Sequence, residues 1–309
     1  MYLRGKAEEQ MMVQQFLDYL QLERRYSLHT VEAYQNDLLQ FCDFLQMNPN
    51  EFNPEKVTTT DVREWIIQLM EEGKHPRTVK RKISSLMSFW KFLMRNGNVS
   101  VDIMRKIVAP KTNKPLPVFY KQQEVDAALA MNDEDDYKQC LENTIIDFLY
   151  ETGVRCSELI QLMDADVDLQ EKTVKVLGKR NKHRIIPFGD SLAKTLERYR
   201  EMRERELPNA VTPNFFILPN GKQLYRGRVY NIVHARMKEV STLHQQSPHV
   251  LRHTFATAML NNGADINAVK AVLGHASLAA TQVYTHTTFN EIHTIYKQAH
   301  PRAQKKEEL

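Results

Sequence analysis

The segment from Ser247 to His253 combines a helix start with side chains suited to an anion. Serine at the N-cap and Pro248 at the first helical position predict that a helix begins here. His249 and Arg252 then lie three residues apart on one face of its first turn. Free backbone N–H groups and the positive end of the helix dipole favour negative charge at such a turn. The pattern predicts an anion-binding site.

The same segment contains a second spacing that must be weighed, because His249 and His253 are four residues apart, as in a zinc-binding pair. The zincin pattern requires glutamate after the first histidine, whereas this chain has Val250. Arg252 would also place a fixed positive charge between the two ligands. We therefore expect no metal site here.

Other segments carry polar residues that are weak signals when each is taken alone. They are Arg155 within residues 152–159, Lys179 in a predicted hairpin turn, His275 after Leu273-Gly274, and Tyr284 within residues 281–286. In this order and at these spacings, together with the 247–253 segment, the sequence resembles the tyrosine recombinases, and within them the Xer-type chromosome-dimer resolvases. The resemblance covers nearly the whole chain. Carried over position by position, it implies a catalytic set of Arg155, Lys179, His249, Arg252, His275 and Tyr284.

The chemistry of strand cleavage explains why these residue types are wanted. Attack on a phosphodiester concentrates negative charge on two non-bridging oxygens, and Arg155 and Arg252 could clamp them with fork-shaped, permanently charged donors. A tyrosine with a pKa of ~10 is almost wholly protonated at neutral pH, so Tyr284 needs nearby cations or a base before it attacks. The product would be a 3′-phosphotyrosine, which a DNA hydroxyl can reverse. Lys179 is the expected general acid for the departing 5′-oxygen.

The resemblance also implies that His249 aids proton movement at the nucleophile and that His275 hydrogen-bonds the phosphate. Because the ester stores the bond energy, we expect no ATP, no cofactor and no metal, and Gly178-Lys179 lacks the glycine spacing of a P-loop.

The distribution of charge points to a polyanion. The net charge is only +4, but residues 73–114 hold eleven Lys or Arg and one acid, Asp102. Each phosphate neutralised by such cations releases condensed counterions, so we expect double-stranded DNA as the partner. The residues predicted to contact DNA are Lys74, Arg77, Lys80, Arg81, Lys82, Lys91, Lys111 and Lys114.

The order of elements predicts a mainly α protein of two domains. Helical spacing predicts four helices within residues 11–97, followed by a basic, proline-containing linker at 98–117. Further helices are expected at 121–131, 137–151, 157–163, 190–206, 226–241, 248–261, 265–273, 277–284 and 289–298, around an antiparallel hairpin at 173–177 and 184–187. The resemblance assigns residues 1–97 to a SAM-like, four-helix core-binding domain and 118–298 to an α+β catalytic domain with a small antiparallel sheet. Residues 299–309 are expected to pack on a neighbouring protomer or to fray.

Composition limits the remaining possibilities. At ~100–200 residues per domain, 309 residues favour two domains. Apolar runs are too short for a membrane helix and the N-terminus lacks a secretory signal, so a cytoplasmic location and no membrane partner are expected. Three separated cysteines, Cys42, Cys140 and Cys156, indicate neither a disulfide framework nor structural zinc.

The resemblance further implies four protomers, identical or paralogous, that exchange strands through a Holliday junction, with a DNA translocase as a candidate activator. Three alternatives stay open. The chain could be the integrase of a phage or mobile element, a type IB topoisomerase, or a DNA-binding accessory protein without catalysis. The complete six-residue set argues against the last of these.

Overall fold

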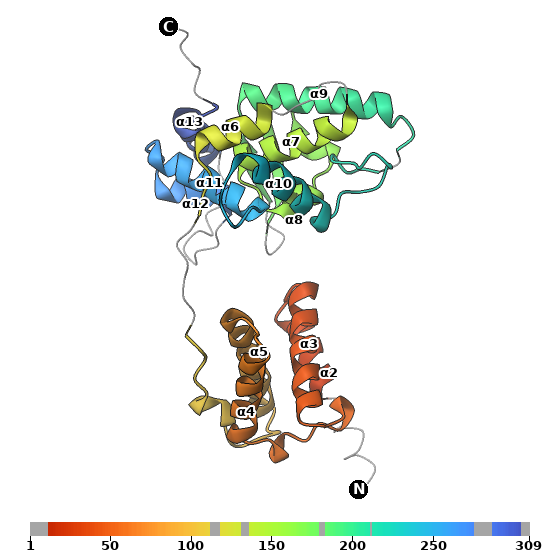
Figure 1. Ribbon diagram of the computed structural model, residues 1–309, viewed down its shortest axis with the longest axis vertical. Helices are drawn as coiled ribbons and strands as arrows, with labels where there is room; N and C mark the ends of the chain where they lie inside the picture. The colour runs from red at the N-terminus through yellow and green to blue at the C-terminus, as the bar shows by residue number, and fades with distance from the viewer. Residues whose placement is uncertain are drawn as a thin grey trace. The chain divides into compact units, whose positions relative to one another are not determined.

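The computed structural model describes residues 12–111, 118–130, 136–178, 183–210, 212–274 and 286–303, with only the backbone described for 286–292. The chain divides into two compact units, residues 1–115 and 116–309 (Figure 1). None of the helices in these described ranges has the length and apolar character needed to cross a bilayer.

The first unit is helical, and the four helices predicted within residues 11–97 are confirmed. Its elements are α2 (Met12–Asp18), a π-helical turn (Tyr19–Glu23), α3 (Leu28–Phe44), α4 (Thr59–Glu71) and α5 (Pro76–Arg95), with 3₁₀ turns at Pro49–Glu51, Pro54–Lys56 and Ile103–Lys106. Aromatic side chains fill its core: Phe16, Phe89 and Trp90 are almost completely buried. The helix starts follow the local sequence, since Thr58 and Asp61 form a reciprocal capping box at α4 and proline opens α5.

The predicted linker begins later than the sequence indicated. Residues 98–117 were predicted to form an extended linker, but Ile103–Lys106 forms a 3₁₀ turn, and Met104 and Ile107 are buried in the core of the first unit. Thr59 also donates a hydrogen bond to the carbonyl of Ile103 at 3.0 Å. The prolines and basic residues of this stretch suggested a linker. Its apolar residues nevertheless pack into the four-helix core. Residues 112–117 lie outside the described part.

The second unit surrounds a small sheet with helices, which confirms the α+β prediction (Figure 1). Its strands β1 (Val167–Asp168), β2 (Thr173–Leu177) and β3 (His183–Pro187) are antiparallel in the order β1-β2-β3. The hairpin was predicted, whereas β1 was missed because two residues carry no alternation. The helices are α6 (Gln122–Ala130), α7 (Tyr137–Thr152), α8 (Cys156–Ile160), α9 (Asp190–Glu206), α10 (Arg226–Val240), α11 (Pro248–Asn261), α12 (Ile266–Leu273) and α13 (His286–Ala299).

Helix α7 is the centre of this unit. Nearly every residue from Cys140 to Thr152 is buried, and the helix packs against α9 and α11. A helix that is buried all round must satisfy its polar side chains internally. Asp147 and Glu151 do so with residues from the end of the chain, as described next.

The segment after α13 packs on its own chain. Tyr296 and His300 are almost completely buried, and the Tyr296 hydroxyl donates to Glu151 at 3.1 Å. The Arg302 guanidinium donates to Asp147 and to the Ser191 hydroxyl. Residues 299–303 therefore pack on the second unit of their own chain, whereas residues 299–309 were expected to pack on a neighbouring protomer or to fray. Residues 304–309 lie outside the described part.

Candidate active site

Arg155 is positioned by the turn between α7 and α8. Helix α7 ends at Gly153, whose φ of +59° is accessible to glycine, and Arg155 is the N-cap of α8 with an extended backbone. Its guanidinium donates to Glu158 at 2.9 Å and to the carbonyl of Gly274 at 3.2 Å. These contacts engage two of its five donors, and the side chain remains 32% exposed. Arg155 is thus held in place while still open to a ligand.

Arg252 projects from α11 into the same region and is 5% exposed. It donates to the carbonyl of Gly153 and to that of Leu273, the latter at 2.6 Å. Burial and, to a smaller extent, the charge of Arg155 together lower the pKa of this guanidinium to about 10. Two like charges held together in a partly dry site repel each other, so an anion between them would stabilise both.

His249 lies one turn before Arg252 in the first turn of α11, where it is exposed between buried neighbours. The helix begins at Pro248 as predicted, although the side chain of the N-cap residue Ser247 makes no capping hydrogen bond. Partial burial lowers the pKa of His249, and the charges of His253, Arg252 and Arg155 add to the effect. His249 is therefore neutral near pH 7 and able to accept a proton.

The structure brings three of the six predicted catalytic residues together. The charge of Arg155 acts on both Arg252 and His249, so these groups share one electrostatic environment. The other three, Lys179, His275 and Tyr284, lie outside the described residues. Described elements flank each of them along the sequence: β2 and β3 on either side of Lys179, and α12 and α13 on either side of His275 and Tyr284.

Glu158 and Arg184 also contribute to this electrostatic environment, and neither was predicted from the sequence. Glu158 accepts the backbone N–H of Arg155 at 2.8 Å as well as its guanidinium, and it is buried. Burial alone would raise the pKa of Glu158, but hydrogen bonds and charge from Arg184 and Arg155 outweigh burial and hold that pKa below its ordinary value. The three-residue spacing from Arg155 was a usable signal for Glu158, since it fits a helix start. Arg184 gave none, because it looks like any polar residue of a strand.

The predicted DNA-contacting cations of the first unit separate into two groups. On α5, exposed Arg77, Lys80, Arg81 and Lys91 recur at helical spacing along one face. Lys74, just before this helix, and Lys111, further along the chain, are also exposed. Lys114 lies outside the described residues.

Lys82 requires a correction. Its ammonium is buried, 3.0 Å from the carboxylate of Asp37, and it also donates to Gln40. Asp37 is itself completely buried and accepts from Ser85 and Arg81. Lys82 therefore locks α3 to α5 and is not presented to DNA. Its position in a basic run concealed that it falls on the buried face.

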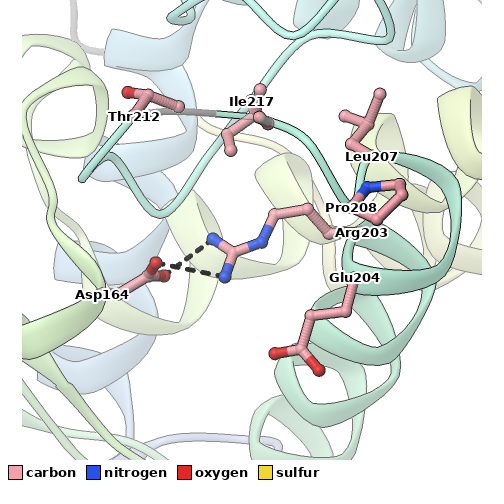
Figure 2. A pocket seen from close by; sticks show the side chains of 8 residues that line it. Asp164, Arg203, Glu204, Leu207, Pro208, Thr212 and Ile217 are labelled. Carbon is pink, nitrogen blue, oxygen red and sulfur yellow. Dashed lines mark hydrogen bonds and ion pairs between the residues drawn. The ribbon is translucent and has the colours of Figure 1, made fainter.

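A separate pocket of about 320 Å³ in the second unit does not add a site (Figure 2). Its one arginine, Arg203, donates to both carboxylate oxygens of Asp164, at 2.7 and 3.1 Å, and to the carbonyl of Phe215 at 2.8 Å. A guanidinium committed in this way has a structural role.

Comparison with known proteins fits this geometry. Residues 119–291 match the model of the phage integrase family, and residues 13–97 match the phage integrase N-terminal SAM-like domain. The chain belongs to the phage integrase family. Among phage integrase family members, tyrosine recombinase XerC of Oceanobacillus iheyensis is 38% identical over 297 residues, which cover 95% of this chain and 97% of that protein. Tyrosine recombinase XerD of Listeria monocytogenes is 35% identical over 294 residues, covering 94% and 99%.

Solved structures agree on the fold. The XerH site-specific recombinase bound to palindromic difH substrate aligns with 92% of this chain and 84% of its own, at a TM-score of 0.67 and 19% identity. The predicted family and class of enzyme, a site-specific tyrosine recombinase, are confirmed by the family match and the relatives.

Proposed function

We propose that this chain cuts duplex DNA at a specific site through attack of Tyr284 on a phosphodiester, and that it rejoins the strands by way of a Holliday junction. The convergence of Arg155, Arg252 and His249 in the second unit carries the proposal. Two guanidinium groups whose mutual repulsion is only partly offset by Glu158 form a receptor for the negative charge that develops on the phosphate oxygens. Neutral His249 beside them can take part in proton transfer.

The remaining roles follow from the chemistry. Tyr284 forms a bond to phosphorus while the bond to the 5′-oxygen breaks, and the leaving oxygen takes a proton from Lys179. His275 would donate a hydrogen bond to the phosphate. The 5′-hydroxyl of a partner strand then attacks the phosphotyrosine and releases the phenol, so no external energy source is needed.

Exposed cations of the first unit support duplex DNA as the substrate. Arg77, Lys80, Arg81 and Lys91 form a face of α5 on which cations are concentrated, and Lys74, Lys111 and Lys114 extend the set along the sequence. Such cations contact phosphates without regard to sequence and fix the orientation of the protein on DNA. We assign residues 1–97 to DNA binding and 118–303 to catalysis.

The biological role that fits best is resolution of chromosome dimers in the cytoplasm by a tetramer of identical or paralogous subunits, with a DNA translocase as activator. Its support is the similarity to XerC and XerD over almost the entire chain. Integration of a mobile element is the alternative, and the genomic position of the bound sequence separates the two.

A nicked suicide duplex tests the cleavage step. The recombination site is first identified by selection from random duplexes, and a nick near the cleavage point lets the cut fragment diffuse away. Wild type should be trapped covalently in the presence of EDTA, whereas Tyr284→Phe should bind the duplex without trapping. The matched control Tyr225→Phe removes an exposed phenol of the same unit and should trap normally. Binding without any adduct from wild type would leave only an accessory DNA-binding role.

A further inference from the structure

Arg184 occupies an unusual position for an arginine. It lies on β3 opposite Val176 of β2, on the sheet face that also buries Ile186, and it is 5% exposed. An arginine at an inward, apolar strand position is costly unless its donors are well satisfied. Its burial also prevents it from contacting DNA directly.

The Arg184 guanidinium joins three elements. Its two terminal nitrogens donate to the two carboxylate oxygens of Glu158 on α8, both at 2.8 Å. Its Nε donates to the carbonyl of Val272 near the end of α12, at 2.6 Å. The nitrogen Nη1 would lie 3.1 Å from a Cβ at Gly274, so the absence of a side chain at Gly274 makes room for it.

The end of α12 is a platform for three arginines. Its last carbonyls have no partner within the helix, and they lie at the negative end of the helix dipole. The carbonyl of Val272 accepts from Arg184, that of Leu273 from Arg252, and that of Gly274 from Arg155. Three successive backbone oxygens thus set the positions of three guanidinium groups immediately before His275.

Glu158 connects Arg184 to Arg155 a second time, since its carboxylate accepts from both side chains. One negative charge is shared between two cations, so Arg155 is only partly neutralised. If Arg184 were absent, Glu158 would pair with Arg155 alone, and less positive charge would face a phosphate.

We propose that Arg184 is a positioning residue for DNA cleavage: it anchors Glu158 and the end of α12 so that Arg155 and Arg252 are aligned and Arg155 keeps its charge for the phosphate. This role rests on the proposed function of the two arginines. Because Arg184 lies on β3, which follows Lys179 in the sequence, it also ties this strand to the same platform.

Single-turnover trapping on the nicked duplex, with full-length protein in excess over DNA, tests this role. Arg184→Gln should slow adduct formation by ~100-fold, the effect of misplacing a catalytic group by about 1 Å. The affinity for the duplex and its salt dependence should stay unchanged, because Arg184 contacts no phosphate. Arg184→Lys, which keeps the charge and one contact to Glu158, should show an intermediate rate, and it carries the test if the glutamine variant does not fold.

The matched control is Arg203→Gln. Arg203 is another buried arginine of the second unit with a bidentate carboxylate partner, Asp164, and its partners differ from those of Arg155 and Arg252 (Figure 2). Its loss should lower stability but leave the trapping rate of the folded protein at the wild-type value.

The double variant Arg184→Gln/Glu158→Gln separates positioning from simple stability. Removing the carboxylate frees Arg155 from full neutralisation, so the double variant should trap at least ~5-fold faster than Arg184→Gln, a coupling typical of residues in one ion-pair network. If Arg184→Gln traps at the wild-type rate, or no more slowly than Arg203→Gln, or if the double variant gains nothing, the positioning role is wrong. If wild type itself forms no adduct, the proposed function fails instead.

Discussion

Replacing Glu151 by glutamine should stabilise the second unit at neutral and alkaline pH. Glu151 and Asp147 lie one turn apart on α7, both almost completely buried, and Arg302 is the cation that faces both. Burial and, to a smaller extent, the nearby charge of Asp147 together raise the pKa of Glu151 to about 8. Burial also raises the pKa of Asp147. His300, which packs against the same helix, is kept neutral because burial lowers its pKa to about 3.

The sign follows from proton linkage. Between the ordinary pKa of 4.5 and about 8, the folded protein holds a proton on Glu151 that the unfolded chain has released. Stability is therefore full below pH 4.5, falls as the pH rises, and levels off above about 8. Each pH unit costs at most ~1.4 kcal/mol, so the limit across this window is ~5 kcal/mol and the cost at pH 7 is at most ~3 kcal/mol. Glutamine imitates the neutral acid and removes this cost.

The two tryptophans make the assay specific. Both Trp65 and Trp90 are in the first unit, so their fluorescence follows that unit alone, whereas circular dichroism follows both units. Urea titrations from pH 5 to 9, followed by circular dichroism, give the free energy of unfolding of the second unit. Glu151→Gln should raise this free energy by ~2–3 kcal/mol at pH 7 and should flatten its dependence on pH. The fluorescence transition should not move.

The control is Glu142→Gln on the same helix. Glu142 is half-buried and ion-paired with Arg228 at 2.7 Å, so its replacement should cost at most ~1 kcal/mol. If Glu151→Gln were less stable than wild type at pH 8, or kept the wild-type slope with pH, the buried proton would have to reside elsewhere.

Three further predictions concern the site and the residues that support it. Arg252→Lys removes the guanidinium that bridges the carbonyls of Gly153 and Leu273. It should slow covalent trapping, measured by quench-flow, by ~100–1000-fold, with little loss of duplex affinity in filter binding. Equal losses of trapping rate and affinity would contradict a catalytic role. Gly153→Ala places a Cβ 2.5 Å from the Phe255 ring at a φ of +59° and should lower the unfolding free energy by ~3 kcal/mol or more. Its control, Gly263→Ala, is also at positive φ but has open space around it, so it should lower the unfolding free energy by only ~1 kcal/mol. Similar losses in the two variants would rule out the steric explanation. Lys80→Met should reduce the slope of log affinity for duplex DNA against log salt concentration by ~1, at unchanged stability. Lys82→Met should destabilise the first unit and leave this slope unchanged. The reverse result would show that Lys82 contacts DNA.

Backbone carbonyls hold Arg252 close to Arg155. Like charges in a partly dry environment would separate if they could, and Arg252 is prevented from doing so by carbonyls at the ends of both α7 and α12. Both helices end in a glycine with positive φ, Gly153 and Gly274. The arginines are therefore held by the C-terminal caps of these two helices.

Much of this was determined by the sequence alone. Helix starts such as the Thr58–Asp61 capping box and Pro248 at α11 depend on residues within one turn. Hydrophobic spacing identified the helices and the β2–β3 hairpin, because periodicity is a local property. The catalytic set stays a prediction from the sequence, made because its residue types follow from phosphoryl chemistry and its order matches a family.

Tertiary structure alone decided which charged residues are available. Lys80 and Lys82 are two positions apart in one basic run, yet one faces solvent and the other is buried against Asp37, because α3 packs on one side of α5. The role of Arg184 likewise depends on α12 ending 88 residues further along the chain, at Val272. A charged side chain can be buried only where residues from distant elements pair with it, and no local sequence pattern identifies those residues.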